Sequence, residues 1–479
     1  MLLLTLVISS VFSACKKGNK NGNQAPETQI SIKEINLVGN NRLQTVIRLN
    51  WFGIDPDGYI KGYEISLDNS NWNFVTTQDS TFRFSISSGS DTTDIDFYVR
   101  AIDDLDTRDP SPAYLKIPLK NTPPTAEIDD EYFAGDTAHS VLTFRWNAND
   151  LDGAETIKEA YIKVNEGNWF SIPVNKKLVS LVSTTPEATG NVTANVYMQS
   201  ETSPLTNTID GFVLNGNNKI YIKVKDIAGS ESLIDTSEVV YMKNKKGDLL
   251  FINGQPNGVR DNYLNIFNSV YTNNYDFIDY YEQSGKNQPK FWNPNFTLLI
   301  KLYKKLFINS DPTLFTNSIT GVNSILLEFA TPSLQEFIDE GGRVLVTANF
   351  PTDRSLFDLE TLRGVLPIDS LVTVPSNQQA RIVSDSAIVP QVAGNYPSVK
   401  PNSVITGVVP FYPTPDSEVF YKAQLTKING WSGSNTVAAR RIQAGKVVQV
   451  FFSVELYRFD KVQSDLNALF NKILNEDFN

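Results

Sequence analysis

Two pairs of carboxylates have residue types and spacing that suit chemistry. Asp55 and Asp57 form one pair, Asp150 and Asp152 form the other, and a glycine follows each pair directly. Carboxylate oxygens suit Ca²⁺, but this ion takes about six to eight ligands. We therefore predict a turn at each pair, in which the Asp side chains accept hydrogen bonds from backbone amides and the glycine takes positive φ. A Ca²⁺ site is the alternative.

Only one cysteine and one histidine occur in the sequence, Cys15 and His139. They cannot supply a disulfide, a Cys/His zinc site or a mechanism that needs two histidines. Everything beyond His139 therefore has neither a thiol nucleophile nor an imidazole base.

The composition is that of a folded, acidic protein. The 479 residues include 42 Lys+Arg and 53 Asp+Glu, a formal net charge of −11. At about 150 residues per domain, this length predicts roughly three domains. No block of basic residues is present, so nucleic acid is not a predicted partner.

The start of the sequence is an apolar run of eleven residues, 2–12, which is shorter than the roughly twenty that span a bilayer. The small residues Ser13 and Ala14 then precede Cys15, as at a signal-peptide cleavage site. This segment resembles the lipobox of bacterial lipoproteins, although Phe12 replaces the usual leucine and no Lys or Arg precedes the run. The resemblance implies a signal peptide over 1–15 and a lipid anchor on Cys15. A buried structural thiol is the alternative.

Residues 16–25 are rich in Lys, Gly and Asn and are predicted to form a flexible tether. Lys16 and Lys17 stand where acidic residues direct surface export in some lipoproteins. We therefore expect an outer-membrane lipoprotein of the bacterial cell envelope that faces the periplasm.

An internal repeat follows the tether. Trp51 precedes Asp55, and Trp146 precedes Asp150, by the same four positions, and 98–103 parallels 221–226. This self-similarity predicts two diverged copies of one domain. Each copy also has a second tryptophan, Trp72 or Trp169. All four tryptophans are predicted to lie in the core, with sugar-stacking platforms as the alternative.

Short segments of alternating polarity, such as 46–51 and 220–225, are separated by Asp-Gly, Asn-Gly and Pro turns and predict antiparallel β-sandwiches for both copies. The order Trp, Asp-x-Asp-Gly, Trp, then Val-Arg-Ala-x-Asp resembles fibronectin type III and related immunoglobulin-like modules. Pro123-Pro124 marks a boundary, so sandwiches are predicted over 26–120 and 121–246. A stretch near 175–210, rich in Ser, Thr, Asn and Pro, is predicted to be a long loop.

Continuous apolar strands alternating with helices predict an α/β domain over 247–479, with a mainly parallel, doubly wound sheet. Expected strands are 248–253, 275–280, 305–309, 343–347 and 447–452, and expected helices are 323–339 and 461–474. The step from helix through Glu340-Gly341-Gly342-Arg343 to a strand resembles the class I glutamine amidotransferase-like, flavodoxin-like fold. Catalytic members of that class place a nucleophilic Cys after such a strand, where this sequence has Thr347-Ala348-Asn349-Phe350. The resemblance thus implies a domain that has lost its usual reaction.

Any ligand site is expected at the carboxyl ends of the parallel strands. The polar residues predicted to gather there are Asn253, Gln255, Asn257, Arg260, Asn309, Asp311, Asn349, Asp353 and Arg354. Amides, arginines and carboxylates of this kind suit a polyhydroxylated or anionic ligand.

Three functions follow as hypotheses. The first is a noncatalytic lipoprotein whose sandwiches present the last domain for binding a ligand, such as a glycan, or an envelope protein. The second is a carbohydrate-active hydrolase that uses carboxylates of the crevice. Its candidate residues are Asp311, Glu328, Asp353 and Asp358. The third is a structural component of envelope assembly.

Overall fold

The computed structural model describes residues 22–33, 37–38, 42–87, 89–271, 274–281, 288–350, 354–372 and 379–479. Cys15 and the segment 1–15 lie outside these residues. The described chain forms two compact units: Met1–Pro124 with Asn149–Lys158 and Lys225–Glu231, and Thr125–Ala148 with Glu159–Val224 and Ser232–Asn479.

The first unit contains a β-sandwich. Its three-stranded sheet has the order β1 (Glu27–Ile32), β4 (Val46–Ile54), β7 (Asp79–Arg83). The facing sheet has the order β2 (Leu37–Val38), β3 (Arg42–Leu43), β9 (Ala113–Lys120), β8 (Thr92–Asp103), β5 (Ile60–Ser66), β6 (Asn73–Val75). Ile47, Leu49 and Trp51 of β4 point into the core, which confirms the predicted alternation of this strand.

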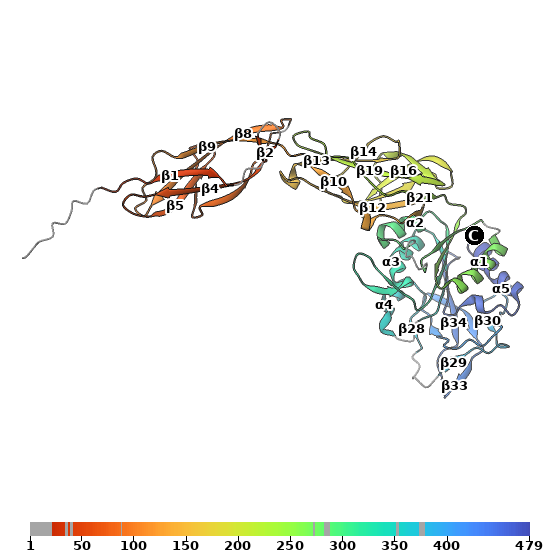
Figure 1. Ribbon diagram of the computed structural model, residues 1–479. Coiled ribbons are helices and arrows are strands. Elements are labelled where there is room, and N and C mark those ends of the chain that lie inside the picture. The colour runs from red at the N-terminus through yellow and green to blue at the C-terminus, as the bar shows by residue number, and fades with distance from the viewer. Residues whose placement is uncertain are drawn as a thin grey trace, which may run out of the picture. The chain divides into compact units, whose positions relative to one another are not determined.

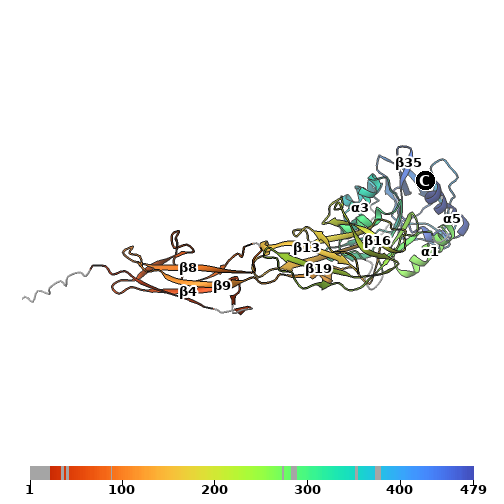
Figure 2. The same cartoon turned by 90° about the horizontal axis from the view of Figure 1, so that it is seen from above.

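The second unit begins with another sandwich (Figure 2). One sheet has the order β10 (Thr125–Ile128), β12 (Val141–Asn149), β15 (Leu178–Ser183), β16 (Gly190–Met198), β17 (Thr208–Leu214). Another has the order β14 (Phe170–Ile172), β13 (Ile157–Val164), β19 (Ile220–Asp226), β20 (Asp235–Thr236). A third joins β11 (Thr137–His139), β21 (Val240–Lys243) and β18 (Gly216–Asn218).

The prediction of a long loop near 175–210 is wrong. β15, β16 and the start of β17 occupy half of this stretch, and every residue of Leu178–Ser183 is buried. β15 pairs with β12 on one side and β16 on the other, so even its two serines are covered. The other Ser, Thr and Asn residues lie in the turns and on β16. Composition alone cannot distinguish such an arrangement from a loop.

The rest of the second unit is an α/β domain with an eight-stranded sheet. Its order is β23 (Asp276–Asp279), β22 (Leu249–Gly254), β24 (Lys305–Ser310), β27 (Arg343–Ala348), β35 (Lys446–Phe452), β34 (Thr436–Gln443), β32 (Ser417–Ala423), β30 (Ile388–Pro390). The first five strands are parallel, and the last three add antiparallel pairs. The predicted mainly parallel α/β sheet is therefore present.

Helices cover both faces of this sheet (Figure 1). α1 (Asn257–Tyr271) and α5 (Gln463–Asn471) pack on one face, and α2 (Thr297–Ile300), α3 (Leu326–Asp339) and α4 (Leu359–Arg363) on the other. Side chains alternate between these faces, so Leu249 and Phe251 meet α1 while Leu250 and Ile252 meet α3. This two-sided burial explains why β22 reads as a continuous apolar run.

Two predicted helices differ in their limits. Asn323–Ile325 pairs as β26 with β25 (Leu314–Thr316), so α3 begins only at Leu326. It ends at Asp339, and the predicted glycine cap follows at Gly341, whose φ of +96° is readily adopted only by glycine. α5 covers 463–471 and continues as a π-helical turn over Lys472–Asp477.

Smaller elements complete the domain. Two short ladders pair β28 (Ser370–Leu371) with β31 (Phe411–Tyr412), and β29 (Gln379–Arg381) with β33 (Thr426–Ile428). Single helical turns occur at Asp130–Tyr132, Ala154–Thr156, Trp292–Phe296, Arg354–Leu356 and Leu456–Arg458.

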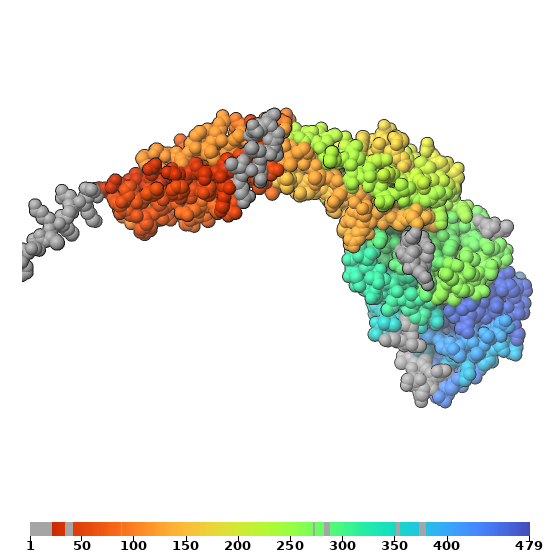
Figure 3. All heavy atoms as spheres, viewed as in Figure 1, coloured from red at the N-terminus to blue at the C-terminus, as the bar shows by residue number. Residues whose placement is uncertain are grey.

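Within the second unit, the sandwich lies in contact with the α/β domain (Figure 3), and side chains of both belong to one hydrophobic core. Val141 and Val182 of the sandwich belong to the same hydrophobic cluster as α2 and α3. Asn295 Nδ2 donates to Thr143 Oγ1 at 3.0 Å across this contact. Apolar packing and a polar contact thus join the two parts of this unit.

Candidate functional site

A row of polar side chains crosses the carboxyl ends of the parallel strands. The strand register places Asp279 of β23 beside Asn253 of β22, Asn253 beside Asn309 of β24, and Asn309 beside Thr347 of β27. All four residues are buried. The prediction that Asn253 and Asn309 meet at one edge is confirmed, because parallel strands end on the same side of a sheet.

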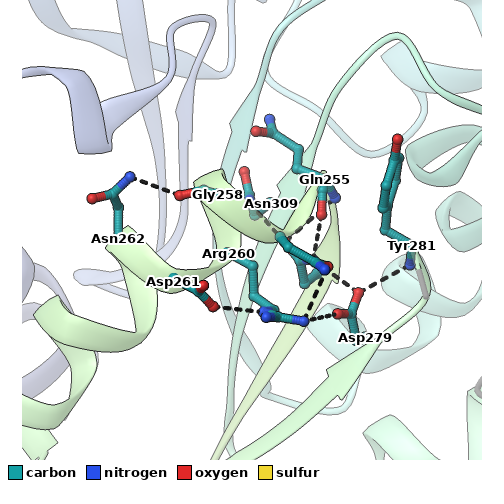
Figure 4. Close-up of polar contacts among 10 residues, drawn as sticks. Gln255, Gly258, Arg260, Asp261, Asn262, Asp279, Tyr281 and Asn309 are labelled. Atoms are coloured by element: carbon teal, nitrogen blue, oxygen red, sulfur yellow. Dashed lines mark hydrogen bonds and ion pairs between the residues drawn. The ribbon is translucent and has the colours of Figure 1, made fainter. Parts of the chain in front are cut away.

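Asn253 is the centre of this row, because it bonds to residues of both neighbouring strands. Figure 4 shows its partners Asp279, Asn309 and Gln255 close together. Its Nδ2 donates to Asp279 Oδ1 at 2.9 Å and to the carbonyl of Gln255 at 2.7 Å, and its Oδ1 accepts from Asn309 Nδ2 at 2.9 Å. Because each of these groups is buried, every bond that Asn253 makes satisfies a polar atom that water does not reach.

Gln255 follows β22 and is only 1% exposed. Its Nε2 donates to the carbonyl of Ser310 at 2.8 Å. Its Oε1 is buried and accepts no hydrogen bond from the described residues. A buried acceptor of this kind is costly unless a ligand or water supplies the donor. As far as the described residues go, Gln255 is the unsatisfied position of this network.

Arg260 lies near the start of α1, as predicted, but its charge is already paired. Its Nη1 lies 3.1 Å from Asp279 Oδ2, and its Nε lies 2.8 Å from Asp261 Oδ1. Nη1 also donates to Asn257 Oδ1 at 3.1 Å. Two carboxylates therefore balance Arg260, which makes this edge better suited to a neutral polar ligand than to an anion.

The remaining predicted residues divide into two groups. Asp311 and Asn349 are partly buried after β24 and β27, and Asn349 N donates to the Ser310 carbonyl at 3.1 Å. Asp353 and the side chain of Arg354 lie outside the described residues.

Several residues of this edge escaped the sequence reasoning. Tyr263 of α1 shares a hydrogen bond of 3.2 Å with Thr347 Oγ1, and burial raises the pKa of its phenol. Glu455 follows β35 and lies 3.3 Å from Arg458. Its place just beyond a predicted strand was a usable signal, since every parallel strand ends at this edge.

Asp311 and Glu455 are electrostatically coupled. Burial raises the pKa of Asp311 above its ordinary value. Burial also raises the pKa of Glu455, and the charge of Asp311 raises it further, against the lowering effect of Arg458. Both carboxyl groups therefore favour the protonated form more than an exposed carboxylate does, chiefly because they are buried.

The other two candidate carboxylates have local structural roles. Glu328 Oε2 accepts from the backbone N–H of Asp358 at 3.2 Å. Asp358 is the N-cap of α4 and accepts from Glu360 N at 3.0 Å, and its bond with Thr361 lowers its pKa. The N-cap role accounts for the hydrogen bonds and the lowered pKa of Asp358 without any catalytic role.

At the end of β27, where catalytic amidotransferases carry a cysteine, buried apolar side chains stand on either side of Asn349. Ala348 and Phe350 are each 2% exposed and lie in the core, and Phe350 stacks on Phe357. Packing side chains therefore flank Asn349 at this end of the strand.

The repeated Asp-x-Asp-Gly segments both form turns. Asp55 Oδ1 accepts from Asp57 N at 3.2 Å, and Asp150 Oδ1 accepts from Asp152 N at 2.8 Å, as predicted. Gly153 has a φ of +125°, but Gly58 has no positive φ, so that part of the prediction is wrong for the first copy. Among the described residues, no group of three or more His, Cys, Asp or Glu side chains is placed to hold a metal ion.

The two turns differ in burial. Asp57 is exposed, whereas Asp150 and Asp152 are 4% and 5% exposed. Burial raises the pKa of Asp150, and the charges of Asp152 and Asp226 add to this effect, while its bond with Thr156 opposes it. The same sequence motif thus has an exposed and a buried environment in its two copies.

The four tryptophans of the repeat have two different environments. Trp51 and Trp146 are 1% and 0% exposed, which confirms their predicted place in the cores. Trp72 and Trp169 are only partly buried, so the prediction is wrong for them. Cations cover these two rings instead: Arg100 lies 4.0 Å from the Trp72 ring, and the Lys223 ammonium 5.0 Å from the Trp169 ring.

Comparison with known proteins yields fold likenesses only. No protein-family model and no curated protein matches the chain. Among solved structures, it is similar to the fibronectin(III)-like modules of Clostridium thermocellum CbhA, with 13% identity over 45% of this chain and 94% of that chain at a TM-score of 0.16. It is also similar to a two-domain fibronectin type III segment of chicken tenascin, with 10% identity over 46% and 99% at a TM-score of 0.24.

The PKD1 domain of Vibrio anguillarum Epp is similar as well, with 13% identity over 20% of this chain and 96% of that chain at a TM-score of 0.15. Because these scores are low, the fold assignment depends on the strand pairing described above. That pairing defines β-sandwich domains followed by an α/β domain with a mixed, largely parallel sheet.

No helix in the described ranges combines the length and the apolar character needed to cross a bilayer.

Proposed function

We propose that this chain is a noncatalytic lipoprotein of the bacterial cell envelope that binds a polyhydroxylated ligand, such as a glycan, at the carboxyl edge of its α/β sheet. In this proposal Cys15 carries the lipid, 16–25 form the tether, and the sandwiches are spacers. The last domain is a degenerate relative of the class I glutamine amidotransferases. It has lost the nucleophile and the base of that class.

One observation carries the binding proposal: the buried, unpaired Oε1 of Gln255 beside a network that is otherwise hydrogen-bonded. Hydroxyl groups of a sugar are donors that would satisfy this acceptor. The carboxylates around Arg260 favour a neutral partner over an acidic one. Amide and carboxylate acceptors that converge on one edge are the groups expected for recognition of hydroxyls.

We expect a panel of neutral oligosaccharides to raise the thermal midpoint of the full chain in a concentration-dependent way. A ligand at a hundred times its Kd adds about 2.7 kcal/mol to the free energy of unfolding. Gln255→Met, which keeps a similar side-chain volume but removes the amide oxygen, should abolish the shift. Gln443→Met, at an exposed position of β34, is the matched control and should respond as the wild type does. A flat response of the wild type to the whole panel would exclude this ligand class.

A separate experiment tests the proposed lipid anchor on Cys15. We expect Cys15→Ser to move the protein from the membrane fraction to the soluble fraction of cells, because the thioether to the lipid can no longer form. Ser13→Ala keeps a small residue before the cysteine and should leave the protein in the membrane fraction. Membrane association that survives Cys15→Ser would contradict a lipid anchor at this residue.

A hydrolase is the second candidate function, and it is favoured by two carboxyl groups with raised pKa values, Asp311 and Glu455, which both follow strands at this edge. Glycoside hydrolysis uses one carboxyl group as an acid and another as a base or nucleophile, with the two roughly 5–10 Å apart. Release of a smaller sugar from any member of the oligosaccharide panel would support this function over simple binding.

A further inference from the structure

A groove with a volume of about 650 Å³ lies within the second unit, where the second sandwich meets the α/β domain. β11 and β21 contribute to its wall, together with the segment after β21 and the start of β23. Its polar and aromatic lining includes His139, Tyr241, Lys243, Asn244, Lys246 and Tyr275. Because Tyr275 precedes β23, the groove is at the amino end of that strand and is distinct from the crevice at the carboxyl ends.

The groove carries two lysines in a chain whose net charge is −11. Lys243 and His139 are register partners on the parallel strands β21 and β11, so their Cα atoms are neighbours. Within the described parts of the chain, neither the Lys243 nor the Lys246 ammonium forms an ion pair. Unpaired ammonium groups at a concave surface attract anions.

The carboxylate in the lining does not neutralise these lysines directly. Asp276 Oδ2 accepts from the backbone N–H of Lys246 at 2.7 Å and from the Tyr303 hydroxyl at 3.0 Å. Burial raises the pKa of Asp276, which disfavours its charged form.

The third feature is the histidine. His139 Nδ1 is buried and has no hydrogen-bond partner among the described residues. Burial, with the charges of Lys243 and Lys246, lowers the pKa of His139 to about 3, so the imidazole is neutral at physiological pH. A neutral imidazole beside two ammonium groups can donate one N–H to an acceptor that also balances the lysine charges.

We propose that this groove binds a small ligand through an oxyanion, a carboxylate or a phosphate, with Lys243 and Lys246 supplying the charge and His139 a hydrogen bond. Asn244 and the rings of Tyr241 and Tyr275 suit the remainder of a polar, ring-shaped molecule such as an acidic sugar. The volume is that of a typical small-molecule site. This inference does not depend on ligand binding at the carboxyl edge, which has a different set of residues.

The sole histidine makes the test direct, because the full chain has one imidazole signal in a spectrum of ¹³C-labelled histidine. We expect titration with sodium phosphate or with glucuronate to move this signal in a saturable way. The bound anion stabilises the imidazolium, so the pKa of His139 should rise from about 3. Lys243→Ala and Lys246→Ala should each weaken binding on the order of tenfold, as for the loss of one charge-assisted hydrogen bond.

Lys446→Ala, at an exposed position of β35, removes the same charge elsewhere and should leave the titration unchanged. A shift with phosphate alone identifies the ligand as a phosphate, and tighter binding of glucuronate identifies an acidic sugar. The proposal is overturned if neither anion gives a saturable shift, or if the Lys243→Ala/Lys246→Ala double variant titrates as the wild type does. Because the readout is the His139 signal, failure of the glycan test at Gln255 leaves this result unaffected.

Discussion

Asn253→Leu is expected to lower the free energy of unfolding of the α/β domain by about 2–6 kcal/mol, because the Asp279 carboxylate and the Asn309 amide each lose a buried partner at about 1–3 kcal/mol apiece. Leucine has the same branched arrangement of heavy atoms as asparagine, so the change removes hydrogen bonds without opening a cavity. Asn253 is 0% exposed, and water cannot replace the lost bonds.

Hydrogen exchange of the full chain, followed in peptides that contain β22 and β24, measures this effect in the affected domain. The protection factor of these amides should fall tenfold for each loss of about 1.4 kcal/mol in the free energy of unfolding. Asn262→Leu, on the exposed side of α1, makes the same change without a buried partner and should alter stability by less than about 0.5 kcal/mol. Wild-type protection in Asn253→Leu would mean that the polar row contributes nothing to stability.

Asp152→Ala is expected to destabilise the first unit by about 2–4 kcal/mol, whereas the equivalent change in the first copy of the motif, Asp57→Ala, should cost less than about 0.5 kcal/mol. Asp152 is 5% exposed and accepts from the Thr45 hydroxyl and from Thr122 N, the latter at 2.8 Å. Its removal leaves both donors without an acceptor. Asp57 is exposed, and its contact with Gln24 N is 3.2 Å long, so water replaces it readily.

Exchange of the Thr122 amide in Asp152→Ala reports the local loss, and the peptides of β4 and β9 report the stability of the unit. Comparing the two variants is informative because Asp57 and Asp152 occupy the same place in the repeat and differ only in their surroundings. Equal effects of Asp57→Ala and Asp152→Ala would show that the turn itself, rather than its burial, determines the cost.

Periodicity predicted the parts of the fold that depend on local pattern. The alternation around Trp51 predicted a strand with one buried face, and the continuous apolar run of Leu249–Ile252 predicted a strand buried on both faces. Both predictions are confirmed. The prediction of a loop near 175–210 was wrong because the burial of β15 comes from neighbouring strands and from the α/β domain. These contacts leave no periodic pattern in the sequence of the segment.

For the candidate site, the sequence alone determined which residues follow each strand, and hence that Asn253 and Asn309 end at one edge, because parallel strands share their direction. It also determined that neither a thiol nor an imidazole is available in the last domain. Only the tertiary structure decided that Asp279 and Thr347 extend this row, that Arg260 is neutralised, and that Gln255 keeps an unpaired oxygen. The physical reason is that burial and pairing depend on residues distant in sequence, and the two copies of Asp-x-Asp-Gly, one exposed and one buried, show this within a single chain.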